Sequence, residues 1–222
     1  SADFRHSFLI KKMINSTKQI QIETILNGLY KDAACDFHKV IKGALKSVFR
    51  PMKPSDFRNA YLSISREQGK YLKKLITDHN LKNIVEFGTS FGISTLFLAQ
   101  GVMETGGKVI TTELVRPKAL KAIENFKKAG VENLIEVRQG DALATLKNHV
   151  EPIDLLVLDG WKDLYLPIFE MLEANFYANT FIYVDNAEMG ETRAFLKAVA
   201  KKSRYEMKFK HNRKAVLISR RS

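Results

Sequence analysis

Short apolar segments alternate with helical segments over most of this 222-residue chain, and this alternation constrains the fold more than any other feature. From about residue 66 onward, the segments that read as strands are 83–87, 108–113, 134–137, 153–158, 180–184, 205–210 and 215–219. Apolar strands separated by helices indicate a parallel sheet with both faces covered. The last two strands are joined too tightly for a crossover and must form an antiparallel hairpin. The sequence therefore predicts an α/β fold, a doubly wound and mostly parallel seven-stranded sheet with an antiparallel C-terminal hairpin, preceded by N-terminal helices.

The first 50 residues carry apolar side chains at helical spacing with lysines between them. We expect this helical pattern to be interrupted at Asn27-Gly28 and to resume over residues 37–48. Pro51 and Pro54 lie in a helix-breaking segment, residues 50–56, which is the best candidate for a linker. The predicted division is an N-terminal helical appendage, residues 1–58, that covers the substrate site or forms a dimer contact, followed by a main domain, residues 59–222.

The composition excludes several classes of protein. Hydrophobic residues at 45% and charged residues at 27% exclude a chain that is mainly disordered. The longest apolar runs are far too short to span a bilayer, and no secretion leader is recognised, so we expect no membrane span. The single cysteine, Cys35, cannot form an internal disulfide, which favours a cytoplasmic location.

The net charge of +12 is unevenly distributed along the chain. Residues 1–82 carry 16 basic and 7 acidic residues, residues 83–200 carry 11 and 16, and residues 201–222 carry 9 and 1. An acidic middle segment thus lies between two basic ends. Basic ends can attract nucleic acid, an anionic membrane or acidic small molecules, or simply form a solvated surface, and the composition does not choose among these.

Glycine and acidic residues follow the first three predicted strands. Gly88 and Gly92 allow a ligand to approach the backbone and the free amides of the next helix. Their Gly-x-x-x-Gly spacing fits a dinucleotide pyrophosphate poorly. Glu113 suits the hydroxyls of a ribose or caps a helix, and Asp141, before Ala142, suits the amine of adenine or caps a helix. Together these residues favour an adenosine-type ligand.

Oxygen-bearing side chains also follow the fourth and fifth predicted strands. Asp159 follows one strand, and Asp185 and Asn186 follow the other. If these strands are neighbours, the three side chains meet at one rim and can hold Mg²⁺ or another hard divalent cation, although each could instead cap a helix. Lys162 lies one turn from Asp159, and Trp161 packs against a planar ligand or belongs to the core.

This combination resembles the cation-dependent S-adenosylmethionine O-methyltransferases, the family that contains catechol and caffeoyl-coenzyme A O-methyltransferases. The resemblance covers roughly residues 60–220 and is most specific in residues 158–167, which read LDGWKDLYLP. It implies a Rossmann-like methyltransferase fold for residues 59–222, with S-adenosylmethionine and Mg²⁺ as cofactors and a small aromatic hydroxyl compound as substrate.

The resemblance also assigns roles to individual residues. It implies that the methionine part of the cofactor is held by Glu86, Gly88, Thr89 and Ser94, with a further cofactor contact from Ile64. It implies that Glu113 binds the ribose and that the adenine lies among Asp141, Ala142 and Trp161. The implied metal ligands are Asp159, Asp185 and Asn186, with Asp159 also beside the cofactor, and the implied catalytic base is Lys162.

The sequence departs from the family pattern at two positions. Ala215 stands where catechol O-methyltransferase has a glutamate that contacts the second substrate hydroxyl, and Gly160 replaces a larger residue. The leading hypothesis is a metal-dependent O-methyltransferase acting on a small catechol-like or phenolic substrate, in a protein that forms a homodimer. The alternatives are O-methylation of a hydroxylated tRNA base, suggested by the basic ends, and a binding protein that has lost catalysis.

Overall fold

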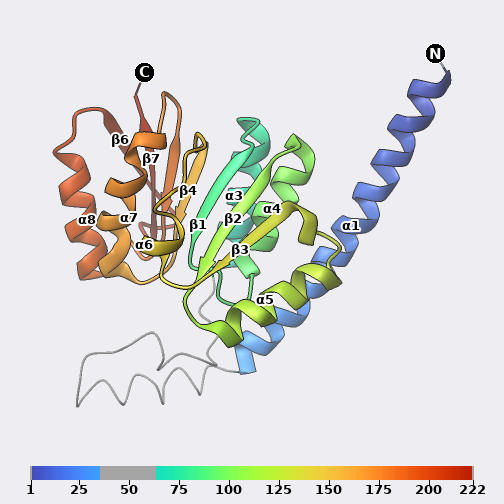
Figure 1. The fold of residues 1–222 in the computed structure, drawn as a ribbon, viewed down its shortest axis with the longest axis horizontal. Helices are drawn as coiled ribbons and strands as arrows, with labels where there is room; N and C mark the ends of the chain where they lie inside the picture. The colour runs from blue at the N-terminus through green and yellow to red at the C-terminus, as the bar shows by residue number, and fades with distance from the viewer. Residues whose placement is uncertain (1, 36–63, 222) are drawn as a thin grey trace.

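The computed structural model describes residues 2–35 and 64–221, and over these residues the predicted fold is confirmed. A seven-stranded sheet lies at the centre, with the strand order β3-β2-β1-β4-β5-β7-β6 (Figure 1). Neighbouring strands from β3 to β5 are parallel, whereas β7 is antiparallel to both β5 and β6. The strands are β1 (Asn83–Phe87), β2 (Lys108–Glu113), β3 (Ile135–Gln139), β4 (Leu155–Leu158), β5 (Phe181–Val184), β6 (Tyr205–Lys210) and β7 (Ala215–Arg220).

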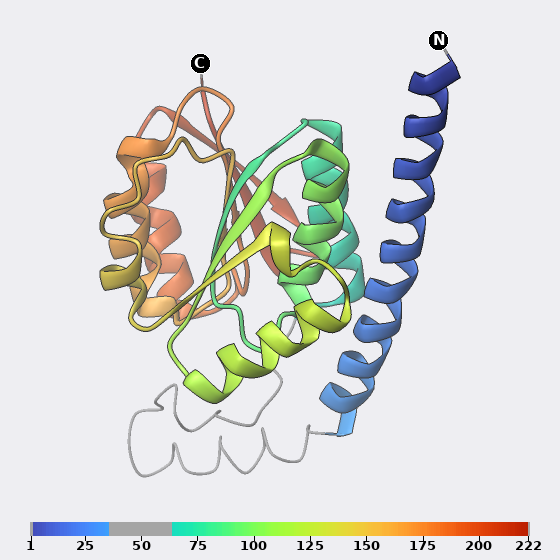
Figure 2. The same ribbon diagram turned by 45° about the vertical axis from the view of Figure 1, so that its right-hand side comes forward.

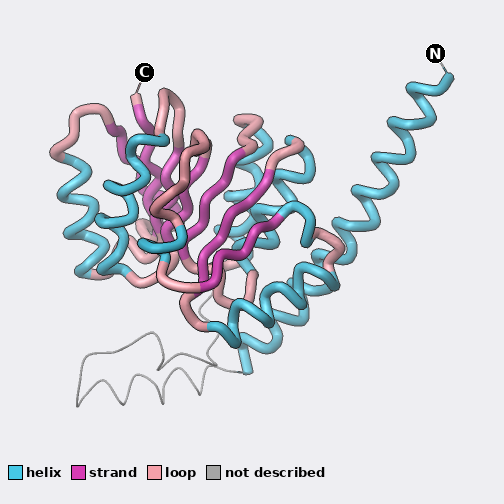
Figure 3. The backbone as a smooth tube through the Cα atoms, in the orientation of Figure 1, coloured by secondary structure: helices cyan, strands magenta, loops and turns pink. Residues whose placement is uncertain are grey.

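Helices cover both faces of this sheet (Figures 1 and 3). One face packs against α1 (Ala2–Cys35), α3 (Arg66–Asp78), α4 (Ile93–Thr105) and α5 (Arg116–Lys128). The opposite face packs against α6 (Ala142–Thr145), α7 (Tyr165–Leu172) and α8 (Gly190–Ala200). Single 3-10 turns lie at η2 (Glu132–Leu134), η3 (Lys162–Leu164) and η4 (Glu173–Asn175).

The strands supply apolar side chains to both layers because successive residues of a strand point to opposite faces. In β4, Leu155 and Val157 join the core under α3 and α4, whereas Leu156 and Leu158 join the core under α7 and α8. All four side chains are fully buried. This explains why the strand reads as a continuous apolar run in the sequence.

The N-terminal segment forms one continuous helix, α1, so the interruption predicted at Asn27-Gly28 is wrong. A glycine inside a helix costs only about 0.5–1 kcal/mol relative to alanine. Burial of Ile22, Leu26 and Leu29 in the core beside α4 offsets this cost. Figure 2 shows α1 running alongside the α3–α4 layer, with its first turns extending beyond the other helices.

Other predicted features of the N-terminal half fall on residues that the structure leaves undescribed. The helical segment over 37–48, the linker over 50–56 and the boundary after residue 58 lie outside the described residues. Within 2–35 and 64–221, no helix has the length and apolar character needed to cross a bilayer.

Candidate functional site

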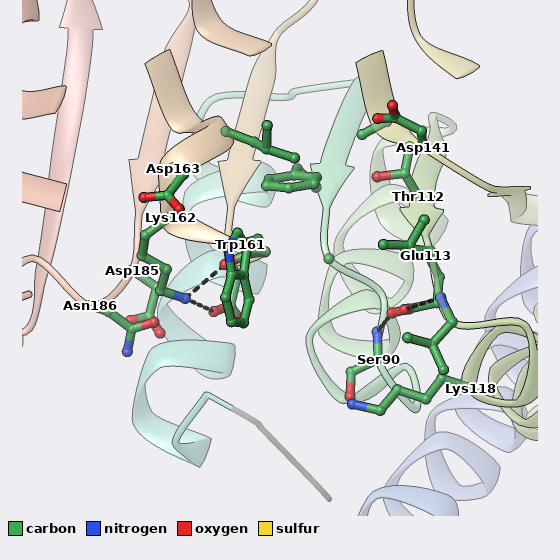
Figure 4. Close-up of a pocket in the computed structure, with 18 of the residues that line it drawn as sticks. Ser90, Thr112, Glu113, Lys118, Asp141, Trp161, Lys162, Asp163, Asp185 and Asn186 are labelled. Atoms are coloured by element: carbon green, nitrogen blue, oxygen red, sulfur yellow. Dashed lines mark hydrogen bonds and ion pairs between the residues drawn. The ribbon is translucent and has the colours of Figure 1, made fainter. Parts of the chain in front are cut away.

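A cavity of about 580 Å³ opens at the carboxyl ends of the parallel strands, where doubly wound sheets bind their ligands. The segments that follow β1, β2, β3, β4 and β5 all contribute to its wall (Figure 4). Most of the predicted site residues line it, and these are Gly88, Glu113, Asp141, Ala142, Asp159, Trp161, Lys162, Asp185 and Asn186. The fold thus brings together residues that are up to about a hundred positions apart in the sequence.

Asp159 and Asp185 follow the neighbouring strands β4 and β5. These strands are paired in parallel, and the backbone N–H of Asp185 donates to the carbonyl of Leu158 at 3.0 Å. Burial raises the pKa of both carboxyls, and the charge of Asp185 raises the pKa of Asp159 further. Two buried carboxylates in such proximity make a site that favours a cation.

Asn186 adds an amide oxygen to this pair. Its φ of 55° lies in the left-handed region, which asparagine adopts more readily than most residues. Among residues 2–35 and 64–221, no group of three or more His, Cys, Asp or Glu side chains could hold a metal ion. A cation here therefore depends on two carboxylates and this amide, a set of hard oxygen donors that fits Mg²⁺ when other ligands complete the coordination.

Lys162 lies in η3, immediately after the turn that follows β4. Its Nζ donates to the carbonyl of Gly160 at 2.9 Å and lies 3.9 Å from Asp159 Oδ1. The ammonium also lies 5.5 Å from the centre of the Tyr165 ring, and the side chain is only 17% exposed. Figure 4 shows the amine at the same end of the cavity as Asp185 and Asn186. A lysine placed there can exchange a proton with a hydroxyl bound beside the two aspartates.

Glu113 lies on the other side of the cavity, at the end of β2 (Figure 4). Its Oε2 accepts from the backbone N–H of Ser90 and its Oε1 from that of Val115, both at 2.8 Å. The carboxylate therefore joins the loops after β1 and β2, and each oxygen retains capacity for a second hydrogen bond. Asp141 likewise caps α6 by accepting from the N–H of Leu143 at 2.9 Å while it lines the cavity.

Gly88 occupies a position that excludes a side chain. Its φ is +106°, and a Cβ there would lie 2.7 Å from the carbonyl oxygen of Asp159. The loop after β1 therefore packs directly on the loop after β4. Gly160 is similarly constrained, because a Cβ would lie 2.5 Å from the ring of Phe87. That ring fills the space that a larger residue at position 160 would need.

The remaining predicted cofactor residues do not line the cavity. They are Ile64, Glu86, Thr89 and Ser94, which are buried with exposed fractions of 2%, 0%, 1% and 5%, respectively. Glu86 Oε2 accepts from Thr95 at 2.5 Å and from Thr111 at 2.6 Å, whereas Oε1 has no hydrogen-bond partner. Burial raises the pKa of this carboxyl. Glu86 is thus a buried acceptor one residue before Phe87, which lines the cavity.

Residues near the site that were not predicted from the sequence include Ser90, Lys118 and Gln68. Ser90 and Lys118 line the cavity, and Lys118 is only 5% exposed, with a pKa that burial lowers. Lys118 lies in the first turn of the helix that follows the strand ending in Glu113, and this position could have been recognised from the sequence. Gln68, 7% exposed, contacts Asp185 and belongs to a Ser65-x-x-Gln68 capping box that the sequence also displays.

Comparisons with known proteins identify the family of this chain. Residues 44–214 match the model of a family described as O-methyltransferase. Catechol O-methyltransferase of Niastella koreensis is 33% identical over 129 residues, which are 56% of this chain and 58% of that protein. Catechol O-methyltransferase B of Danio rerio is 25% identical over 174 residues, 76% of this chain and 63% of that protein. The chain thus spans about three fifths of the length of these curated relatives.

A solved structure of the same overall fold is the O-methyltransferase from Bacillus cereus, a complex with SAH. It superimposes with a TM-score of 0.70 at 23% identity, over 89% of this chain and 91% of that chain. At this identity the likeness concerns the fold, and the family match over residues 44–214 covers most of the sequence. The chain therefore belongs to the O-methyltransferase family.

Proposed function

We propose that the protein is a metal-dependent O-methyltransferase that moves a methyl group from S-adenosylmethionine to a hydroxyl of a small catechol-like or phenolic substrate. The observation that carries this proposal is the cavity itself. One end presents Asp159, Lys162, Asp185 and Asn186, and the other presents Glu113 beside the close-packed Gly88 turn. A methyl donor and a hydroxyl acceptor bound at these two ends would be held in one orientation, which is the main requirement of the reaction.

The proposed cofactor subsite follows from the second end. The free capacity of the Glu113 oxygens suits the two ribose hydroxyls, and the adenine would lie among Asp141, Ala142 and Trp161. The Gly88 turn lets the methionine part approach the backbone. The buried Glu86 Oε1 would accept from the ammonium group of the cofactor. The further proposed contacts with the cofactor are Thr89, Ser94 and Ile64.

The proposed acceptor subsite follows from the first end. Asp159, Asp185 and Asn186 would hold Mg²⁺ or a similar hard cation, whose chemical contribution is to lower the pKa of a coordinated hydroxyl. Lys162 in its neutral form would then accept the hydroxyl proton on Nζ while its contact with the Gly160 carbonyl fixes the amine. S-adenosylmethionine held at the other end would supply the electrophilic methyl group; the carbon–sulfur bond would break as the carbon–oxygen bond forms, and the neutral thioether would leave.

The test is a methyl-transfer assay with a panel of catechols and monophenols, in Mg²⁺ and in chelator. We expect turnover that chelator removes and that added Mg²⁺ restores, with a large loss in Asp185→Asn. Glu113→Gln serves as the matched variant at the cofactor end, and it should weaken binding of the product S-adenosylhomocysteine instead. Turnover that chelator does not change contradicts the metal role.

A hydroxylated RNA base is a second candidate acceptor, and the β6–β7 turn favours it. Phe209 is 49% exposed, and the Arg213 guanidinium lies 3.9 Å from its ring centre. The N–H of Ala187, next to Asn186, donates to the carbonyl of Lys214 at 2.8 Å, so this aromatic and basic turn adjoins the acceptor end. Bases stack on such side chains while cations contact phosphate. Binding of total tRNA that weakens in Phe209→Ala supports this acceptor, and labelling of phenols alone removes it.

We also propose that residues 1–58 form an appendage and that the protein is a homodimer. Met13 and Ile20 on α1 are 71% and 67% exposed, which suits a surface that a second copy covers. Light scattering should give the mass of a dimer for the wild type and of a monomer for the double variant Met13→Lys, Ile20→Lys. A monomeric wild-type protein contradicts the homodimer.

A further inference from the structure

Gln68 links the start of α3 to the acidic end of the cavity. The residue is only 7% exposed, and both its amide nitrogen and its amide oxygen are hydrogen-bonded. Its Oε1 accepts from the backbone N–H of Ser65 at 2.9 Å. Its Nε2 donates to Asp185 Oδ1 at 2.5 Å and to the hydroxyl of Tyr183 at 3.1 Å. A single neutral side chain therefore connects a helix cap with a proposed metal ligand.

The local sequence determines this position. Ser65 is the N-cap of α3, and its Oγ accepts from the N–H of Gln68 at 3.2 Å while Gln68 bonds back to the N–H of Ser65. This reciprocal capping box fixes the third helical residue and its side chain. Because α3 begins beside the end of β5, the second donor of the amide reaches Asp185, which is 117 positions away in the sequence.

The chemistry of the donor matters as much as its position. An amide donor is neutral, so it hydrogen-bonds the buried carboxylate without placing a positive charge beside it. A lysine or arginine in this place would compete with the cation, and an aliphatic side chain would leave Asp185 Oδ1 free to rotate. The bond on Oδ1 constrains the orientation of the Asp185 carboxylate.

We propose that Gln68 is a positioning residue that holds the Asp185 carboxylate ready for the divalent cation. This inference rests on the proposed metal-dependent function and goes beyond it, because it places a determinant of metal affinity on α3. Loss of a partner that orients a metal ligand typically weakens metal affinity about 10–100-fold. We therefore expect loss of the amide to weaken binding of the cation and to leave binding at the nucleotide end of the cavity unchanged.

The test measures binding of Mg²⁺ by titration calorimetry to the full chain saturated with S-adenosylhomocysteine, so that no turnover is needed. Gln68→Met removes the donor but keeps the length and apolar volume, and Ser65→Ala is the matched control that weakens the same cap without touching Asp185. We expect Gln68→Met to weaken Mg²⁺ binding by about 10-fold or more. Ser65→Ala should lower the melting temperature with Mg²⁺ affinity close to that of the wild type, and S-adenosylhomocysteine affinity should be unchanged in both.

Activity supplies a second readout. In Gln68→Met, the Mg²⁺ concentration for half-maximal rate should rise while the rate at saturating Mg²⁺ recovers. If the wild type binds Mg²⁺ and Asp185→Asn does not, but Gln68→Met binds it normally, the positioning role is overturned and the metal site stands. If the wild type binds no Mg²⁺, the metal role of the proposed function fails, and this inference fails with it. An equal loss in Gln68→Met and Ser65→Ala would show a general effect of the cap and would also overturn the inference.

Discussion

Replacing Gly88 by alanine should damage both stability and cofactor binding. The added Cβ would lie 2.7 Å from the carbonyl oxygen and 2.8 Å from the carbonyl carbon of Asp159, and 2.8 Å from the Cα of Gly160. All three are backbone atoms, so no side-chain rotation relieves the contact. Overpacking costs about 1–3 kcal/mol and an unfavourable φ about 1–3 kcal/mol, which together lower the free energy of unfolding by about 2–6 kcal/mol. For a domain of this size, that corresponds to a melting temperature lower by about 5–20 °C.

The same substitution at Gly28 provides a control of opposite sign. Gly28 lies inside α1, and an added Cβ would have no atom within 4 Å. Alanine should stabilise the helix there by about 0.5–1 kcal/mol, and the melting temperature should rise by roughly 1–4 °C. Melting curves and S-adenosylhomocysteine titrations of both variants are the assay. A Gly88→Ala protein that melts with the wild type and binds S-adenosylhomocysteine equally well would refute the close packing of the two loops.

The other predictions concern individual side chains of the cavity. Lys162→Met should lower kcat by about 10²–10⁴-fold and leave S-adenosylhomocysteine affinity unchanged; an equal loss of both would place Lys162 at the cofactor. Glu113→Gln should weaken S-adenosylhomocysteine binding by roughly 10–100-fold, because hydrogen bonds to a charged acceptor contribute about 1.5–3 kcal/mol; unchanged affinity would contradict the ribose role. In Asp159→Asn, the metal-free protein should lose less stability as pH rises, since burial and the charge of Asp185 raise the Asp159 pKa. A raised pKa contributes stability that is present below about pH 4 and is lost as pH rises through the raised value. Melting curves of wild type and variant in chelator, from about pH 4 to 8, would reveal this difference. Parallel curves for the two proteins would contradict the prediction.

The strands were predictable because their apolar runs reflect burial on both faces. The segment predicted over 108–113, for example, coincides with β2 (Lys108–Glu113), in which every residue after Lys108 is buried. The break predicted at Asn27-Gly28 failed for a non-local reason. A local penalty of about 1 kcal/mol is easily exceeded by burial of two leucines, each worth about 1.5–3 kcal/mol. Leu26 and Leu29 pack in the core beside α4, and nothing within α1 itself reveals that partner.

The features of the site also divide into those that could be predicted from the sequence and those that could not. Asp159 and Asp185 could be placed together because parallel neighbours end at one rim, given the correct strand order. The orientation of Glu86 could not be predicted, because it depends on hydroxyl groups of α4 and β2 that donate to its carboxylate. The contact between Gln68 and Asp185 needs the start of α3 beside the end of β5, a spatial fact that the capping box alone does not contain.

The position of β7 has a consequence for how the protein is made. β7 (Ala215–Arg220) lies between β5 and β6, so a strand near the end of the sequence occupies an interior place in the sheet. While a ribosome has delivered only residues up to 214, β5 has an unpaired edge, and β6 lacks the strand that pairs with it. Unpaired edges attract other chains. Pairing in this half of the sheet therefore waits for residues 215–220, and until they emerge β5 and β6 present edges that can pair with other chains.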